Sequence, residues 1–191
     1  MIIPLTEEYI DRVVILHKKV LGHTLNSKIG SWFLKKLYYQ TLNNKKNGFG
    51  FVYIENKQIL GFISFCIDQK KLSRQIKQNI SFYEKIKILT FLITHPNLLN
   101  KFIKNILFEN FLTTNFQKPY STILTIGVHP NTQGKGIGKQ LIIKCQEVLK
   151  NNNVNTLYVD TEITNKNAIK FYKKIGFKEI KEKLGNVILN L

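Results

Sequence analysis

The chain has 191 residues, of which 43% are hydrophobic, 12% aromatic and 21% charged. These fractions exclude a disordered, collagen-like or disulfide-scaffold protein, and the length predicts one soluble domain over residues 1–191. Lysine and arginine total 29 against 12 acidic residues, which gives a net charge of +17. The surplus suits an anionic partner, but the only arginines are Arg12 and Arg74. Because arginine is the residue that grips phosphates and bases bidentately, specific nucleic-acid binding is not expected.

The amino-terminal residues MIIPLTEEY lack the basic segment, apolar core and cleavage site of a secretion signal. No run of about 18 uncharged apolar residues occurs either, so no membrane span is predicted and a cytoplasmic location is expected. Cys66 and Cys145 lie within apolar stretches, without a CxxC pair or a cluster of cysteines and histidines. Both are expected to be small buried side chains, and no metal site is predicted.

The first part of the chain predicts two helices followed by a β-hairpin. Thr6 precedes two glutamates, an order typical of a helix N-cap with acidic residues in the first turn. Apolar residues at three- and four-residue spacing then indicate helices, and alternation from Phe49 indicates strands. The expected elements are a helix ending near Leu21, a loop at 22–30, a helix at 31–43, a strand from Phe49, a turn at 55–57 and a strand at 59–67.

The second part predicts strands alternating with helices after a helical stretch of about fifty residues. Residues 121–128 are β-branched and apolar, which favours a strand buried on both faces. The elements expected after it are a glycine-rich turn, a helix at 139–149, a strand at 156–161, a helix at 165–174 and a hairpin at 177–191 that turns at Gly185-Asn186.

A glycine-rich stretch at 133–139, Gln-Gly-Lys-Gly-Ile-Gly-Lys, joins the strand at 121–128 to the following helix. Its glycines can turn several backbone N–H groups toward one point at a helix N-terminus, where the helix dipole favours a negative group. The stretch is not a Walker A loop, because Gly138-Lys139 is followed by Gln140 rather than Ser or Thr. It is not the dinucleotide GxGxxG pattern either, because its third glycine comes one residue early.

This stretch and a second block at 165–177 resemble two motifs of the GNAT superfamily of N-acetyltransferases. Residues 133–138 match the superfamily's acetyl-coenzyme A loop, in which Arg or Gln is followed by x-x-Gly-x-Gly or Ala. The second block is similar to Asn-x-x-Ala-x-x-x-Tyr-x-x-x-Gly-Phe, with Ala168, Tyr172 and Gly176 in place. The resemblance implies an α/β GNAT fold, whose mixed and mostly antiparallel central sheet is splayed at the cofactor site and flanked by helices. It also implies acetyl-coenzyme A as cosubstrate and no metal.

The resemblance further implies which residues bind the coenzyme. The N–H groups of 134–139 would hold its pyrophosphate, with two lysines adding charge. The strand edge at 126–128 would pair with the pantetheine arm, with a β-bulge at Gly127, and the N–H near Val128 would polarise the acetyl carbonyl. Asn165 would either bond the pantetheine arm or cap its own helix. The implied set is Ile126, Gly127, Val128, Gln133, Gly134, Lys135, Gly136, Ile137, Gly138, Lys139 and Asn165.

The resemblance gives Tyr172 the role of the acid that protonates the departing thiolate. Direct attack by an amine also needs a group that accepts a proton. Family members that use a carboxylate often place it on the strand before the glycine-rich loop, but this strand has no acid. The candidates for the base are therefore Asp160, Glu162, His17 and His23, and Glu162 is assigned with Tyr172 as the catalytic pair.

The predicted reaction is direct transfer of acetyl from acetyl-coenzyme A to the primary amine of a small molecule such as an amino sugar, by a monomer or homodimer. One alternative acceptor is an amine of a protein or peptide. The other alternative is a non-catalytic basic module that binds nucleic acid or membrane and retains coenzyme A binding. In this fold the segments at 22–30 and 32–39 are expected to wall the acceptor site.

The helical insertion at about 68–118 departs from the short connection of the minimal family pattern. Its predicted helices, at 82–93 and 98–112, alternate apolar residues with lysines. They are expected either to close over the core or the acceptor site or, as basic amphipathic helices, to contact an anionic membrane or a partner.

Overall fold

The computed structural model describes residues 1–115 and 120–191, and for residues 109, 110 and 112–115 it describes the backbone alone. Within these residues, seven strands form one sheet in the order β1-β2-β3-β4-β5-β7-β6. All neighbouring strands are antiparallel except β4 and β5, which are parallel. The strands are β1 (Ile2–Pro4), β2 (Gly48–Glu55), β3 (Gln58–Cys66), β4 (Ser121–Val128), β5 (Leu157–Glu162), β6 (Lys178–Lys183) and β7 (Asn186–Asn190).

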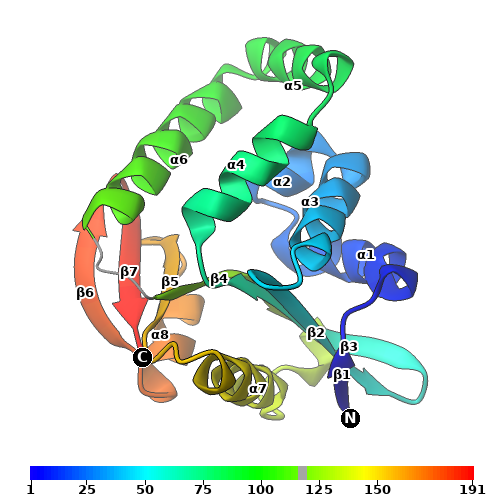
Figure 1. Cartoon of the computed structure of the whole chain (residues 1–191), viewed down its shortest axis with the longest axis vertical. Coiled ribbons are helices and arrows are strands. Elements are labelled where there is room, and N and C mark those ends of the chain that lie inside the picture. The colour runs from blue at the N-terminus through cyan, green and yellow to red at the C-terminus, as the bar shows by residue number, and fades with distance from the viewer. Residues whose placement is uncertain (116–119) are drawn as a thin grey trace.

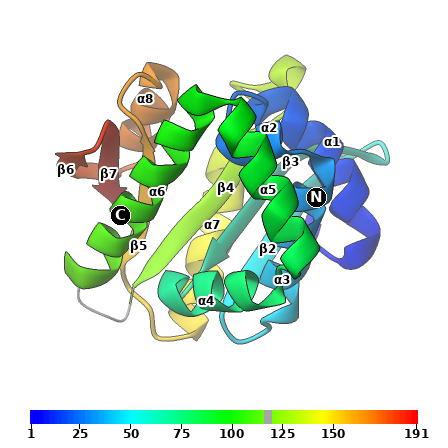
Figure 2. The ribbon, with the colours of Figure 1, turned by 90° about the horizontal axis from the view of Figure 1, so that it is seen from above.

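Helices cover both faces of this sheet (Figure 1). On one face lie α7 and α8, and on the other lie α1, α3 and the insertion helices α4 and α6 (Figures 1 and 2). The helices are α1 (Ile10–Leu21), α2 (Leu25–Ile29), α3 (Ser31–Asn43), α4 (Gln69–Asn79), α5 (Phe82–Thr94), α6 (Pro96–Asn115), α7 (Ile137–Asn151) and α8 (Lys166–Lys174), with 3₁₀ turns at Glu7–Tyr9 and Pro130–Thr132.

The core is divided by the sheet into an apolar cluster on each face. Successive residues of a strand point to opposite faces. Phe62 therefore packs with α1 and α3, whereas its neighbour Ile63 packs with α7. Cys66 and Cys145 are fully buried side chains of the core, as the sequence predicted.

The sheet opens between β4 and β5. These strands pair only at Ser121 with Leu157 and at Thr122 with Tyr158. Beyond these pairs β4 continues to pair with β3 but, among the described residues, no longer pairs with β5. The mixed, mostly antiparallel sheet with a splayed centre, predicted from the sequence, is confirmed.

Two local predictions were wrong, and a third was right only in part. The segment at 22–30 contains α2, because burial of Leu25 orders a stretch whose sequence has no helical periodicity. Thr6 is the N-cap residue of the 3₁₀ turn Glu7–Tyr9, with acidic residues in the first turn as predicted, but its hydroxyl donates to Glu8 at 3.3 Å and accepts no backbone N–H. The final hairpin turns at Leu184 and Gly185, which both have positive φ, one residue earlier than predicted.

The bulge predicted at Gly127 was also wrong. The register of β4 against β3 shifts at Leu124 instead. At Gly127 a Cβ would lie 2.7 Å from the ring of Phe62 and 2.7 Å from Val20. A glycine is required there because α1 and β3 pack directly on the backbone of β4.

Gly127→Ala is expected to lower the stability of the protein. The added methyl group must displace Phe62 or Val20 from a packed core, which typically costs about 1–3 kcal/mol. For a chain of this size the melting temperature should fall by about 3–10 °C. Thermal unfolding followed by circular dichroism measures this, and an unchanged melting temperature would contradict the packing role.

The predicted insertion consists of α4, α5 and α6, and its residues 116–118 lie outside the described residues. On α5, Phe82, Ile86, Leu89 and Ile93 are 79%, 43%, 55% and 63% exposed and recur at helical spacing. Among the described residues, no helix has the length and apolar character needed to cross a membrane. Surface contact of the insertion with an anionic membrane stays a prediction.

Candidate active site

The glycine-rich loop leads directly into α7. Gly134 and Gly136 both have φ of +81°, and a Cβ built on either would meet nothing within 4 Å. Gly136 is the N-cap of α7, and its carbonyl accepts the first bond of the helix from Gln140 at 3.0 Å. The N–H groups of residues 137–139 thus have no partner within the helix, and the open side of the loop can receive an anion.

Three residues of the predicted coenzyme-binding set contact other parts of the protein. The side chain of Ile137 is 4% exposed and belongs to the core. At Gly138 a Cβ would lie 2.9 Å from the ring of Phe171, so this glycine allows α7 to pack on α8. Gln133 donates from Nε2 to the carbonyl of Val128 at 3.2 Å. Ile137 and Gly138 can therefore offer backbone groups to a ligand, and Gln133 fixes the loop against the end of β4.

The free edge of β4 presents backbone groups beside this loop. Along an antiparallel pair, residues alternate between pointing toward and away from the partner strand. His129 directs its N–H to the carbonyl of Leu60 at 2.8 Å. Val128 and Ile126 consequently direct theirs to the other edge, from which β5 has diverged. This edge can pair with an extended ligand as an added strand would.

Asn165 and Tyr172 occupy the two ends of α8. The side chain of Asn165 accepts the N–H of Ala168 at 3.2 Å, which is an N-cap contact. Tyr172 is 5% exposed and lies 5.3 Å, centroid to centroid, from the ring of Phe177. Burial, together with the charge of Asp160, raises the pKa of Tyr172, so its phenol stays protonated and can act as an acid but not as a base.

The structure separates the candidate bases. Glu162, assigned from the sequence, forms an ion pair with Lys101 of α6 and is 43% exposed. Asp160 lies two residues earlier on the same face of β5, and burial raises its pKa to about 6. The side chain of His23 is exposed just beyond α1. Asp160 is partly buried, and a pKa of about 6 suits a base near neutral pH.

His17 heads a chain of polar side chains that reaches β4. Its Nδ1 lies 2.7 Å from the hydroxyl of Tyr38, which is 3.3 Å from Oγ1 of Thr125, which in turn is 2.8 Å from Oγ of Ser64. His17 is 2% exposed and stacks on Phe62. Burial lowers its pKa to about 4, so the ring is neutral near pH 7 and is a weak base.

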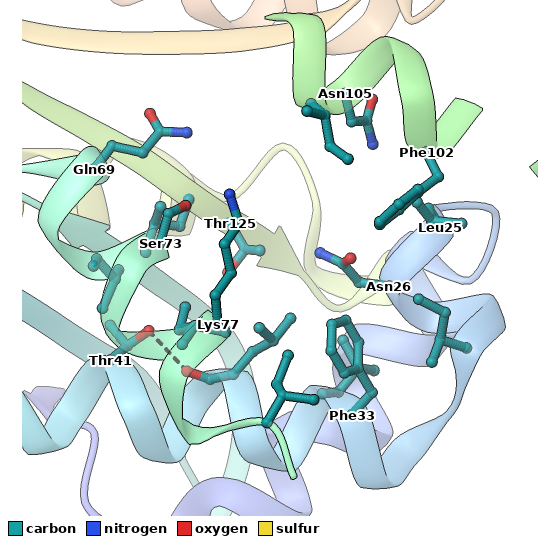
Figure 3. Close-up of a pocket in the computed structure, with 18 of the residues that line it drawn as sticks. Leu25, Asn26, Phe33, Thr41, Gln69, Ser73, Lys77, Phe102, Asn105 and Thr125 are labelled. Atoms are coloured by element: carbon teal, nitrogen blue, oxygen red, sulfur yellow. Dashed lines mark hydrogen bonds between the residues drawn. The ribbon is translucent and has the colours of Figure 1, made fainter. Parts of the chain in front are cut away.

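A cavity of about 640 Å³ lies between the insertion helices and the centre of the sheet (Figure 3). Thr125 of β4 and Asp160 of β5 both line it, so it reaches the place where these two strands part. Leu25 and Asn26 of α2 and Phe33 of α3 also line it, which agrees with the prediction that these segments wall a site. Glu162 and His23 are absent from its described lining.

No cluster of three or more His, Cys, Asp or Glu side chains that could hold a metal ion occurs in the described part of the chain. Asp160 is the one carboxylate in the described lining of the cavity, and both cysteines are buried in the core.

Comparison with known proteins places the chain in a family. The model of the acetyltransferase (GNAT) family matches residues 21–177. The chain belongs to this family. An uncharacterized N-acetyltransferase of Methanocaldococcus jannaschii is 34% identical over 70 residues, which cover 37% of this chain and only 31% of that protein. The GNAT resemblance found in the sequence is confirmed.

Solved structures show the same fold at low sequence identity. The PaiA N-acetyltransferase of Thermoplasma acidophilum, in complex with coenzyme A, has a TM-score of 0.65 and 15% identity over 100% of this chain and 96% of its own. An aminoglycoside 6'-N-acetyltransferase of Acinetobacter haemolyticus has a TM-score of 0.64 and 12% identity, over 96% of this chain and 94% of its own. The ribosomal-protein-S18-alanine N-acetyltransferase of Escherichia coli has a TM-score of 0.61 and 14% identity, over 100% of this chain and 92% of its own.

Sequence reasoning missed the polar chain from Tyr38 through Thr125 to Ser64. The contacts join α3, β4 and β3, which are far apart in the chain. One signal was available, because Thr125 is a hydroxyl residue in the middle of a strand predicted to be apolar and buried.

Proposed function

We propose that the protein is an acetyl-coenzyme A-dependent N-acetyltransferase that transfers acetyl directly to the primary amine of a small molecule. The observation that carries the proposal is the meeting of three features at the parting of β4 and β5: the open glycine loop, the free strand edge and the cavity that contains Asp160. The coenzyme supplies the acetyl group as a thioester.

The chain's own residues fit this coenzyme. The N–H groups of residues 137–139 and the exposed side chains of Lys135 and Lys139 suit a pyrophosphate. The outward N–H and C=O groups of Ile126 and the outward N–H of Val128 suit the amide-bearing pantetheine arm, and the Val128 N–H would stabilise a developing oxyanion. Because the carboxamide of Asn165 already accepts an N–H of α8, its proposed part is to fix that helix.

For the base we favour Asp160 over Glu162. Removal of a proton from the attacking amine requires an acceptor that touches the acceptor site or reaches it through one water. Asp160 lines the cavity, whereas Glu162 is engaged with Lys101 outside it. Transfer of acetyl to the amine forms the N–C bond and breaks the C–S bond; Asp160 takes the amine proton and Tyr172 gives a proton to the departing sulfur.

Tyr172→Phe is expected to lower kcat by about 10²-fold, because a general acid contributes on that order and the leaving thiol has a pKa near 8.5. The dissociation constant of coenzyme A should change less than twofold. Steady-state thiol release and calorimetry measure the two quantities. If kcat were unchanged, Tyr172 would have only a packing role with Phe177.

The proposal is tested by titrating the protein with acetyl-coenzyme A and by measuring thiol release over a panel of amines. Binding with turnover supports the enzyme. Binding without turnover of any amine favours the alternative of a non-catalytic module, and absence of binding contradicts the proposal. It stays a prediction that the acceptor is an amino sugar or, alternatively, a protein amine. The cytoplasmic location and the monomeric or dimeric state of the protein also stay predictions.

A further inference from the structure

The cavity beneath the insertion carries an inference about the acceptor, which rests on the proposed function. Its wall is formed mainly by apolar side chains from five helices, α2 to α6, as Figure 3 shows in part. These include Leu25, Phe33, Leu37, Leu72, Leu92 and Phe102. Leu72 and Leu92 are each 2% exposed, so this part of the wall is firmly packed.

The charges in the wall are few and mostly positive. Among the described lining residues, Asp160 is the one carboxylate, and Lys77 and Lys85 are the cationic side chains. His17 is neutral near pH 7, because burial lowers its pKa to about 4. A site for a polyamine or an aminoglycoside needs several acidic groups to offset the cost of burying several positive charges. The described lining of this cavity provides one acidic group, Asp160, in a chain of net charge +17.

Polar side chains line the cavity on several sides, with Gln69, Ser73 and Asn105 on its helical wall (Figure 3), and a connected group of them lies at the sheet. Thr125, Ser64 and Tyr38 are bonded to one another at the face of β4, and Asp160 lies across the opening between the strands. A primary amine at the sheet lies beside the proposed base, and the rest of the molecule extends into the apolar part. A volume of about 640 Å³ is within the range of pockets that bind ligands of drug-like size.

We propose that the acceptor is a primary monoamine with a large apolar body, aromatic or branched aliphatic, rather than an amino sugar or a polyamine. The insertion helices then set specificity: Ile76 of α4, Ile88 of α5 and Phe102 of α6 are partly exposed in the lining and supply apolar surface that the minimal family pattern lacks. Where this wall is apolar, the hydroxyl groups of an acceptor would lose hydrogen bonds to water without replacement.

The test is kcat/KM for n-alkylamines from butylamine to octylamine, measured by thiol release at saturating acetyl-coenzyme A. These amines share one basicity, so only the buried apolar surface changes along the series. Each buried methylene is worth about 0.8 kcal/mol, or about fourfold, so kcat/KM should rise by roughly two- to fourfold per carbon. A flat series, or a higher kcat/KM for glucosamine, kanamycin or spermidine, would overturn the proposal while leaving the acetyltransferase function intact.

A pair of variants at Ser73 shows where the apolar body binds. Ser73 is a partly exposed residue of α4 that lines the cavity (Figure 3). Ser73→Phe fills part of the volume and should lower kcat/KM for octylamine at least tenfold while changing that for butylamine less than threefold. Ser73→Ala, the matched control, should leave both within twofold. Equal losses for both amines in Ser73→Phe would contradict binding in this cavity.

A binding measurement separates this inference from the failure of catalysis. If no amine is acetylated, calorimetry with octylamine and butylamine in the presence of coenzyme A still reports on the cavity. Octylamine bound at least tenfold more tightly than butylamine, with the difference lost in Ser73→Phe, would support the apolar site even though the proposed activity had failed. Equal affinities would overturn it.

Discussion

Gly136→Asp is expected to abolish binding of coenzyme A, with a dissociation constant raised at least 100-fold in calorimetry. The Cβ position of Gly136 faces open space beside the N–H groups of residues 137–139. An aspartate there places a carboxylate where the pyrophosphate is proposed to lie, so it both fills the site and repels the ligand. The variant should retain its fold, because no core atom lies near this position.

Gly185→Asp is the matched control for this experiment. Gly185 also has positive φ, +85°, and open space around its Cβ, but it lies in the β6–β7 turn. The backbone strain of an aspartate in the left-handed region is therefore similar in the two variants. Gly185→Asp should show a similar loss of melting temperature and unchanged coenzyme affinity. Unchanged affinity in Gly136→Asp would refute the assignment of the loop.

The sequence is enough to predict the conformation of the glycine-rich loop, because that conformation is local. Gly134 and Gly136 need positive φ whatever surrounds them, and a strand before and a helix after them fix the direction of the N–H groups. Gly138 was assigned to the same ligand, yet its contact is the ring of Phe171. That contact depends on α8 packing against α7, which spacing along the chain does not reveal.

The choice of the proposed catalytic base also depends on contacts that spacing along the chain does not reveal. Asp160 and Glu162 are two residues apart on β5, so both point to the same face, and the strand pattern that led to the assignment of Glu162 fits Asp160 equally well. The choice depends on Lys101 of α6, which pairs with Glu162 and comes about sixty residues earlier in the chain. The role of the insertion was equally open, because its apolar stripes could have faced the sheet, a membrane or a ligand.

Asp160→Asn is expected to lower kcat/KM by about 10²- to 10⁴-fold, the range for loss of a general base. In the wild type two protons must be absent before transfer, one from Asp160 and one from the amine. With an alkylamine acceptor, whose pKa lies near 10, log kcat/KM should rise with a slope of one between pH 6 and 9 and with a slope of two below about pH 6. In Asp160→Asn the slope should be one throughout.

The position of this break separates the candidate bases. If His17 were the base, the steeper slope would begin only below about pH 4, because that is its pKa in the folded protein, and Asp160→Asn would keep it. If Glu162 were the base, Glu162→Gln would lose the activity and Asp160→Asn would retain it. A profile of Asp160→Asn that matched the wild type in rate and in slope would remove Asp160 from the mechanism.

A stability measurement shows that lost activity in Asp160→Asn is not lost folding. The pKa of Asp160 is raised on folding from its ordinary value of 3.8 to about 6, because burial disfavours the charged carboxylate. The stability that the neutral carboxyl gives is complete below pH 3.8 and is lost as the pH rises through about 6. Asparagine carries no charge, so Asp160→Asn should melt higher than the wild type at pH 8 and at nearly the same temperature near pH 4. A protein that is more stable at pH 8 but at least 100-fold slower is the outcome expected of a buried carboxylate kept for chemistry rather than for folding.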